Sequence, residues 1–214
     1  ILGPGRIARK FAAGLAEAEG AVLVAVGSRD LGRAEVFAGE FGVERAYGSY
    51  RELAADPGVE AIYIGSPHSG HAAHTILCLE AGKHVLCEKP LALNAAQARK
   101  MINTARSCGL ALMEALWTRF LPVFHSIREK VAAGAIGEIR LIQADFGFRA
   151  DFDPDSRLFA PELGGGTLLD LGIYLLNLAF MLCGRPEEIH TMANLGATGV
   201  DEESAILLRH AGGR

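Results

Sequence analysis

The chain has 214 residues, of which 50% are hydrophobic and 21% are charged, and its formal net charge is -4. This composition suits one large domain or two smaller ones with hydrophobic cores, and it lacks the basic surplus that is typical of nucleic-acid-binding proteins. The longest apolar stretch, 168–183, contains Asp170 and Asn177 and is shorter than the roughly 20 residues of a membrane span, so no membrane partner is expected.

The cysteine pattern predicts neither a metal site nor a redox motif, because the sequence contains no C-x-x-C pair. The four cysteines are scattered along the chain: Cys78, Cys87, Cys108 and Cys183. We expect them to be reduced and buried in a cytoplasmic protein. The chain opens with Ile1-Leu2 directly before a glycine motif and does not begin with Met. We therefore expect the natural start, and any export signal on it, to be missing.

From residue 1 to about residue 116, short β-like runs alternate with helical patterns. The apolar and β-branched runs predict strands over 1–2, 22–26, 46–47, 61–64, 84–87 and 110–113. Hydrophobic periodicity predicts helices over 7–18, 32–41, 49–55, 71–81 and 95–108. Asn94 is the expected N-cap of the last helix, and Gly109 is its expected end. Strands that alternate with helices in this way predict the α/β class, with a doubly wound parallel sheet of the Rossmann type.

After Trp117 the pattern changes, and we place a domain boundary near Leu116, which gives domains 1–116 and 117–214. The second part predicts an α+β domain with an open, mostly antiparallel sheet. Its expected elements are a helix over 120–133, an alternating strand over 136–148, an apolar helix over 167–182, and strands over 188–195 and 203–210. Three strands and one apolar helix make a thin domain, so we also expect a C-terminal part to be missing.

The first strand turns into a helix at a glycine motif, Gly3-Pro4-Gly5-Arg6-Ile7-Ala8. It matches the dinucleotide-binding fingerprint, in which the first Gly makes the turn and the second lets the backbone approach a pyrophosphate. The N–H groups of the helix start, at Arg6 and Ile7, would face the phosphates. A glycine turn that binds no ligand can have the same sequence. Pro4 also has no backbone N–H group to donate to a phosphate. The alternation of strands and helices that follows favours the dinucleotide site.

The residues after the second strand indicate which dinucleotide is preferred. An NAD site usually has an acid at this point, whereas a nearby arginine accommodates the 2′-phosphate of NADP. This chain has Ser28 and Arg29, with Arg33 one helical turn further on. Guanidinium groups bind phosphate through two hydrogen bonds, so the pattern favours NADP over NAD. Asp30 is the counter-argument, because its carboxylate can still reach a ribose.

Two further polar segments follow strands of the predicted sheet, where open α/β sheets bind their ligands. Ser66-Pro67-His68 and His71 are candidates for lining the cofactor, although plain helix capping explains them as well. A metal site is not predicted there, because no acidic or cysteine side chain lies beside the histidines. Glu88-Lys89-Pro90 ends another strand, and a lysine at that point is either a catalytic group or an ordinary surface cation.

Asp170 and Tyr174 form a polar pair in the apolar helix of the second domain. Residues four apart share one face of a helix, so this pair interrupts a stripe of apolar side chains. A buried carboxylate must be paired or hydrogen-bonded. The pair is therefore either a structural anchor or part of a site that faces the cofactor.

These strings together resemble the Gfo/Idh/MocA oxidoreductases, and within that family the dihydrodiol dehydrogenase and NADP-dependent D-xylose dehydrogenase branch. The resemblance covers the whole chain, and its specific parts are Glu88-Lys89-Pro90 and the segment 170–174. It implies that Lys89 is catalytic and binds the cofactor together with Glu88, and that Tyr174 exchanges a proton with the substrate. Asp170 would assist them. The substrate pocket would include Trp117, Arg119 and Phe148.

The resemblance thus implies an enzyme that transfers a hydride between NADP and a CH–OH group of a sugar or vicinal diol. A Lys89 ammonium beside Tyr174 would favour the phenolate form that accepts the hydroxyl proton. A homodimer through the C-terminal sheet is expected. One alternative is a catalytically silent NADP-binding sensor or regulator of the same fold. A site for another adenine ligand, S-adenosylmethionine, is a further alternative, against which the two arginines argue.

Overall fold

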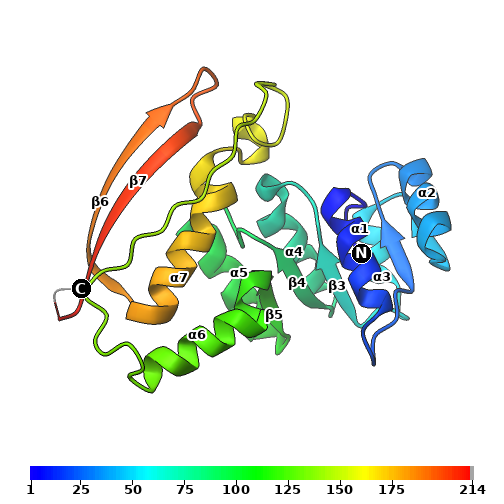
Figure 1. Cartoon of the computed structure of the whole chain (residues 1–214). Coiled ribbons are helices and arrows are strands. Elements are labelled where there is room, and N and C mark those ends of the chain that lie inside the picture. Colours follow the sequence, from blue (N-terminus) through cyan, green and yellow to red (C-terminus); the bar gives the residue numbers. More distant parts are fainter. Residues whose placement is uncertain (213–214) are drawn as a thin grey trace. The chain divides into compact units, whose positions relative to one another are not determined.

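The structure is a computed structural model that describes residues 1–212, and it divides the chain into two compact units (Figure 1). The first unit is Ile1–Ala115, and the second begins at Leu116. The first alternates strands and helices, whereas the second carries one long antiparallel ribbon and an apolar helix.

The first unit alternates five strands with five α-helices. Its elements in chain order are α1 (Arg6–Ala16), β1 (Ala25–Gly27), α2 (Leu31–Phe41), β2 (Arg45–Tyr47), α3 (Tyr50–Ala55), β3 (Ala61–Ile64), α4 (His71–Glu80), β4 (His84–Glu88), α5 (Ala95–Cys108) and β5 (Leu112–Ala115). Local signals set several boundaries. The Asn94 side chain caps α5 by accepting a hydrogen bond from the N–H of Gln97, and Gly109 ends that helix with a φ of 66°.

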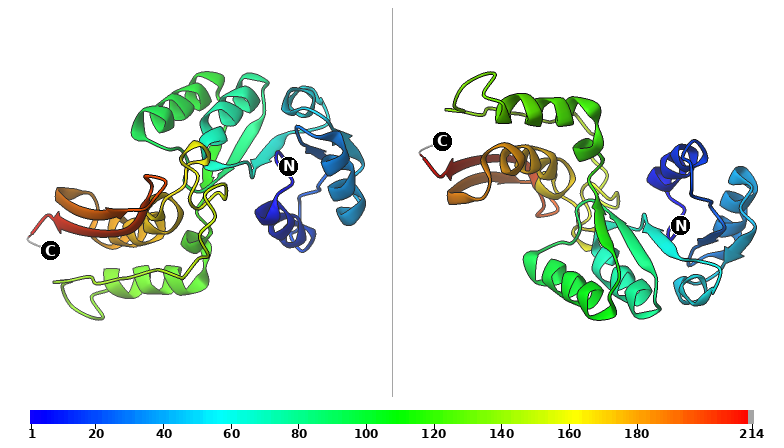
Figure 2. Two further views of the ribbon diagram at one scale, coloured as in Figure 1. Left: turned by 90° about the horizontal axis from the view of Figure 1, so that it is seen from above. Right: turned by 90° about the horizontal axis from the view of Figure 1, so that it is seen from below.

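The strands form one parallel arrangement in which Leu2 takes the central place. β1 pairs with β2, and β3, β4 and β5 pair in that order. Leu2 forms bridges to both Gly27 and Ile64, which joins the two groups of strands. Helices cover both faces (Figure 2), with a separate hydrophobic core under each. This is the Rossmann architecture that the alternation of elements predicts.

Two strands of the first unit lie further along the chain than their patterns predict. The run 22–26 is only partly a strand, because β1 is limited by its partner, the three residues of β2. Val22 is 81% exposed. Likewise, β5 begins at Leu112 rather than at residue 110, since its register follows the pairing with β4. The length of a strand thus depends on its neighbour as well as on its own residues.

The second unit contains α6 (Pro122–Ala132), α7 (Ile173–Cys183), β6 (Pro186–Leu195) and β7 (Asp201–His210). α6 starts two residues later than predicted, because Leu121 is extended and Pro122 occupies the first helical turn. A π-helical turn, Leu168–Gly172, leads into α7. β6 and β7 pair antiparallel, as expected for this domain, and each begins two residues earlier than predicted.

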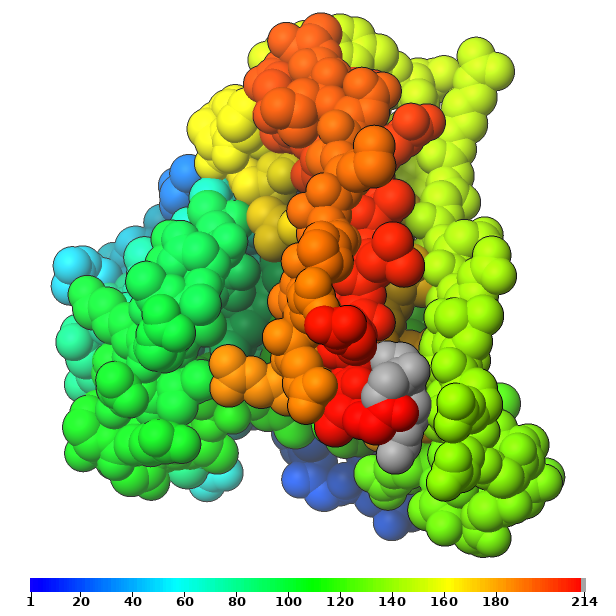
Figure 3. All heavy atoms as spheres, turned by 90° about the vertical axis from the view of Figure 1, so that its left-hand side faces the viewer, coloured from blue at the N-terminus to red at the C-terminus, as the bar shows by residue number. Residues whose placement is uncertain are grey.

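The prediction of a strand over 136–148 is wrong. Within the described residues this segment is extended but pairs with no strand. Its polar and apolar residues alternate, yet a strand also needs a hydrogen-bonded neighbour. Six of its residues, from Ile139 to Phe146, instead line a cavity of about 460 Å³ together with α7 and β7. Figure 3 shows this segment in yellow-green beside β7 in red.

One helical stretch, Pro161–Cys183, is long and apolar enough to cross a membrane, although core helices of soluble proteins pass the same test. It is interrupted by the buried carboxylate of Asp170, which forms an ion pair. Of the four cysteines, all of which are free thiols, Cys78 and Cys87 are buried. Cys108 is exposed at the end of α5, so the expectation of uniformly buried cysteines is wrong.

Candidate active site

The glycine motif forms a tight turn between Leu2 and α1. Gly3 has a φ of 87°, and a Cβ atom on it would lie 3.1 Å from the Ser66 nitrogen and 3.2 Å from the Gly65 carbonyl carbon. Only glycine therefore fits at this position. Gly5 is the N-cap of α1 and provides no side-chain hydrogen bond to it, so the first N–H groups of the helix, from Arg6 and Ile7 on, remain available to an anion.

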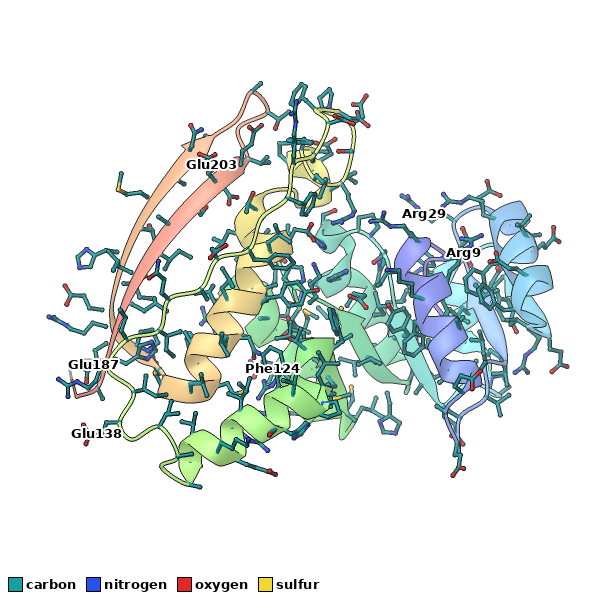
Figure 4. All side chains as sticks on the ribbon, viewed as in Figure 1. Arg9, Arg29, Phe124, Glu138, Glu187 and Glu203 are labelled. Atoms are coloured by element: carbon teal, nitrogen blue, oxygen red, sulfur yellow. The ribbon has the colours of Figure 1, made fainter. Side chains whose placement is uncertain are left out.

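Arg29 lies in the loop between β1 and α2, where its side chain is exposed (Figure 4). The neighbouring Asp30 is the N-cap of α2, and its carboxylate accepts a hydrogen bond from the N–H of Arg33 at 3.3 Å. The Ser28 hydroxyl in turn accepts a hydrogen bond from the N–H of Asp30 at 3.2 Å. The one acid at this corner is thus engaged in capping a helix, while both Arg29 and Arg33 are exposed.

The segment after β3 is held together by histidine hydrogen bonds. His71 is fully buried, and its ring nitrogens lie 2.8 Å from the Pro90 carbonyl oxygen and 2.9 Å from the Ser66 carbonyl oxygen. Burial lowers the pKa of His71, and the charge of Lys89 acts in the same direction. The hydroxyl of Ser66 is within 2.9 Å of Nδ1 of His74. Both ring nitrogens of His71 face backbone carbonyl oxygens, so the ring links the turn after β3 to the loop after β4. A contact of His71 with the cofactor stays a prediction.

Pro67 and His68 complete this turn beside the glycine motif. Pro67 is exposed and precedes the short 3₁₀ helix His68–Gly70, whereas His68 is buried, with its ring 5.6 Å from that of His71. Within residues 1–212, no group of three or more metal-ligating side chains is close enough to hold an ion.

Lys89 directly follows β4, at the carboxyl edge of the parallel sheet. The Glu88 carboxylate accepts a hydrogen bond from the Tyr63 hydroxyl at 2.6 Å and another from the N–H of Lys89 at 3.2 Å. Burial raises the pKa of Glu88, and these two hydrogen bonds and the charge of Lys89 oppose that rise. On β5, the Glu114 carboxylate accepts the N–H of Leu91 at 2.7 Å, which fixes the loop after Lys89.

In the second unit, Tyr174 lies among aromatic side chains. Nε1 of Trp117 donates a hydrogen bond to the Tyr174 hydroxyl at 3.0 Å, and the two rings meet edge to face. Phe146 also packs edge to face against the Tyr174 ring, with 5.8 Å between the ring centroids. Trp117 is 55% exposed and Arg119 is exposed in the same 3₁₀ helix, Trp117–Phe120, so both remain accessible to a ligand.

Asp170 is buried in the π-helical turn and forms an ion pair with Arg157, whose Nη1 lies 3.0 Å from the carboxylate. Asp170 also lines a cavity of about 330 Å³, together with Phe148 and the acidic residues at the start of β7. Phe148 is 57% exposed at the rim. The π-helical turn alters the helical spacing between Asp170 and Tyr174, so the simple four-residue relation predicted from the sequence does not hold there.

Three contacts at these positions were not predicted from the sequence: Tyr63 with Glu88, Phe146 with Tyr174, and Arg157 with Asp170. Tyr63 reads as an ordinary strand residue, and Arg157 lies in a loop without periodicity. Only the sheet register and the course of the loop bring them to their partners. The alternation over 136–148 predicts on which face of a strand Phe146 lies, but it does not predict which residue Phe146 contacts.

Comparison with known proteins agrees with this architecture. Residues 1–116 match the oxidoreductase family with an NAD-binding Rossmann fold, and residues 124–214 match the GFO/IDH/MocA C-terminal domain. The trans-1,2-dihydrobenzene-1,2-diol dehydrogenase of Mus musculus is 47% identical over 193 residues, and that of Homo sapiens is 46% identical over 192 residues. These matches cover 89% of this chain but 57% of each relative, so the chain spans little more than half of their length.

Solved structures give the same result. A 3-ketoreductase from Actinomadura kijaniata, in complex with NADP and TDP-benzene, superposes with a TM-score of 0.91 at 31% identity, over 99% of this chain and 66% of that one. An aldose-aldose oxidoreductase from Caulobacter crescentus, complexed with glycerol, superposes with a TM-score of 0.91 at 29% identity. The superposition covers 99% of this chain and 67% of that one. The chain therefore belongs to the Gfo/Idh/MocA oxidoreductase family, and its curated relatives support the dihydrodiol dehydrogenase branch.

Proposed function

We propose that this chain forms the cofactor-binding unit and part of the substrate-binding unit of an NADP-dependent dehydrogenase. The reaction is hydride transfer between NADP and a CH–OH group of a sugar or vicinal diol. The observation that carries the proposal is the position of Lys89, which directly follows β4 at the carboxyl edge of the Rossmann sheet. Ligands of open α/β sheets bind at this edge. The names of the relatives support the substrate class.

The residues of the first unit fit a bound dinucleotide. A Cβ atom on Gly3 would press on the backbone of Gly65 and Ser66, so only glycine lets the turn pack this closely on the end of β3, as the first glycine of a dinucleotide-binding turn does. The N–H groups at the start of α1 would bind the phosphates. Ser66, Pro67 and His68 would border the bound cofactor from β3, and Glu88 and Lys89 from β4. When bound, the nicotinamide ring supplies or accepts the hydride.

A preference for NADP over NAD follows from the corner after β1. Oδ1 of Asp30 accepts the N–H of Arg33 as the N-cap of α2, which makes this carboxylate less suited to holding a ribose 2′-hydroxyl. Arg29 and Arg33 are exposed and offer guanidinium groups to a 2′-phosphate, and the Ser28 hydroxyl stands at the end of the same strand. The NADP bound in the solved 3-ketoreductase is consistent with this preference.

The proton would be exchanged by Tyr174, with Lys89 as the catalytic cation. The hydrogen bond that Trp117 donates to the Tyr174 hydroxyl stabilises negative charge on that oxygen, as a proton acceptor requires. Asp170 would orient the helix turn that carries Tyr174 through its ion pair with Arg157. Trp117, Arg119 and Phe148 would contact the substrate, since all three side chains are exposed.

We further propose that the protein is cytoplasmic and forms a homodimer through the β6–β7 ribbon. Met192 pairs with Ala205 and therefore shares a face with Leu207, and these two apolar side chains are 79% and 75% exposed. Exposed apolar patches of this kind mark interaction surfaces. Sedimentation of the wild type and of Met192→Lys tests this, because a charge on the face should shift the protein toward the monomer.

The activity is tested by incubating the purified protein with NADP⁺ and a panel of vicinal diols and sugars, including D-xylose, while NADPH absorbance is followed. We expect turnover with at least one of them and much slower turnover with NAD⁺. A protein that binds NADP, as seen from protection against heating, but turns over none of the panel would instead be a sensor. Protection by S-adenosylmethionine and not by NADP would remove the dinucleotide assignment altogether.

A further inference from the structure

The ring of Tyr63 lies between Phe11, in the middle of α1, and Glu88, at the end of β4. The side chain is 5% exposed and stacks on Phe11 of α1, with ring centroids 3.8 Å apart and planes within 3° of parallel. A Cβ atom on Gly65 would lie 3.2 Å from the Tyr63 ring and 3.6 Å from Ala8. Tyr63 therefore packs beside Gly65 and Ala8, next to the glycine turn that leads into the proposed phosphate site.

The hydroxyl of Tyr63 reaches across the sheet to Glu88. Its 2.6 Å distance to Oε1 of Glu88 is in the range of a short, charge-assisted hydrogen bond. Oε2 of Glu88 accepts the N–H of Lys89 at 3.2 Å. The two carboxylate oxygens are thus held from opposite sides, one by β3 and one by the backbone of the proposed catalytic residue.

We infer that Tyr63 is a positioning residue whose hydroxyl fixes the Glu88 carboxylate, in its charged form, beside Lys89. The fixed carboxylate holds the Lys89 backbone through its N–H and presents a negative charge to the Lys89 ammonium. Because the ring also supports the glycine turn, one side chain joins the phosphate end of the proposed cofactor site to its catalytic end. The consequence for turnover rests on the proposed function, whereas the effect on Glu88 does not.

The charges around Glu88 make this role measurable. The groups that act on it are Tyr63 from β3, Lys89 from the loop after β4, and Glu114 from β5. Burial and the negative charge of Glu114 raise the pKa of Glu88, whereas the Tyr63 hydroxyl and the Lys89 ammonium lower it. Loss of the Tyr63 hydroxyl removes one of the interactions that lower the pKa of Glu88, whereas burial still raises it. A larger share of Glu88 is then protonated and neutral.

The test uses Tyr63→Phe, which keeps the ring on Phe11 and removes only the hydroxyl. The titration of the Glu88 carboxyl is followed by ¹³C NMR in the cofactor-free protein, and we expect its midpoint to rise by about one pH unit, a tenfold change in proton affinity. The matched control is Phe11→Leu, which removes the ring stacking and keeps the hydroxyl. It should lower the melting temperature and leave the midpoint of the Glu88 titration unchanged. An unchanged Glu88 midpoint in Tyr63→Phe, or equal shifts in both variants, overturns the inference.

Turnover gives an independent readout. We expect kcat of Tyr63→Phe to fall about tenfold at neutral pH, with the acid limb of its pH profile moved upward and the KM for NADP within about twofold of wild type. In a Glu88→Gln background the same substitution should have no further effect on kcat, and a full second loss would contradict the assignment. A wild type without turnover would count against the proposed function alone, since the NMR titration would still report on Tyr63.

Discussion

The indole N–H of Trp117 and the hydroxyl oxygen of Tyr174 are joined by a hydrogen bond of 3.0 Å, although 57 positions separate the two residues in the sequence. The bond connects the 3₁₀ helix that opens the second unit to the first turn of α7. Because tryptophan can only donate through Nε1, the Tyr174 oxygen must be the acceptor. In the proposed reaction, this donated hydrogen bond would stabilise negative charge on the Tyr174 oxygen while a proton is exchanged with a substrate hydroxyl.

Trp117→Phe tests this relationship. Phenylalanine retains an aromatic edge against the Tyr174 ring but donates no hydrogen bond. Loss of one such bond is worth about 1 kcal/mol, so we expect kcat/KM to fall about fivefold to tenfold. Steady-state kinetics with the best diol or sugar provides the measurement. Phe146→Leu, which touches the same ring without a hydrogen bond, is the control and should reduce kcat/KM less.

Lys89→Met should remove turnover without removing the cofactor. Methionine keeps the length of the side chain but has no ammonium group, so kcat is expected to fall by about 10²-fold or more. The dissociation constant for NADP, measured by fluorescence titration, should change far less. Wild-type turnover in this variant would show that Lys89 is an ordinary surface cation. Lys100→Met, on the exposed face of α5, is the matched control.

Arg29→Ala should weaken NADP binding selectively. A hydrogen bond to a charged group contributes about 1.5–3 kcal/mol, so we expect the NADP dissociation constant to rise by about tenfold or more. NAD has no 2′-phosphate, and its dissociation constant should hardly change. Arg99→Ala, which removes an exposed arginine from α5, should leave both constants as they are. Equal losses for NADP and NAD in Arg29→Ala would place the 2′-phosphate elsewhere.

The ion pair of Arg157 with Asp170 should contribute to the stability of the second unit. The Asp170 side chain is 8% exposed and that of Arg157 is 45% exposed, so solvent screens the pair in part. Arg157→Met leaves a carboxylate buried without this partner and should cost about 2 kcal/mol in urea unfolding. The double variant with Asp170→Asn should recover about half of that loss. Purely additive losses would show that the two side chains are not coupled.

Asp56 should make the first unit sensitive to acid. Burial raises the pKa of this carboxyl, but hydrogen bonds from Gly58 and Tyr47 and the charge of Arg45 outweigh it, so the pKa lies below its ordinary value. Its contribution to stability is therefore present above the unfolded-state pKa of about 4 and is lost as the pH falls through the lower, folded-state pKa. Thermal unfolding of wild type and Asp56→Asn should differ at pH 7 and converge in acid. A constant difference at every pH would refute this linkage.

The parts of the fold that the sequence predicts correctly are those set by residues close to one another in the chain. Ala61–Ile64 is a strand with the predicted bounds, and the Asn94 cap and the Gly109 stop of α5 are both confirmed, because each depends on neighbouring residues only. The segment 136–148 was predicted wrongly, since alternation alone does not supply a partner strand. The predicted site residues could be assigned to strand ends, but Tyr63 could not be found, as its link to Glu88 is made by the register of β3 against β4.

The β6–β7 ribbon has a consequence for how the protein behaves at high concentration. Among the described residues, these two strands pair only with each other, so each has an edge of unpaired backbone groups. Such edges are templates on which extended segments of other molecules add as new strands. The cavity beside β7 brings apolar side chains to that edge. The solubility of this 214-residue chain should therefore fall first when it is concentrated. Leu207→Lys, which also places a charge on the proposed dimer face, should improve the solubility without disturbing the Rossmann unit.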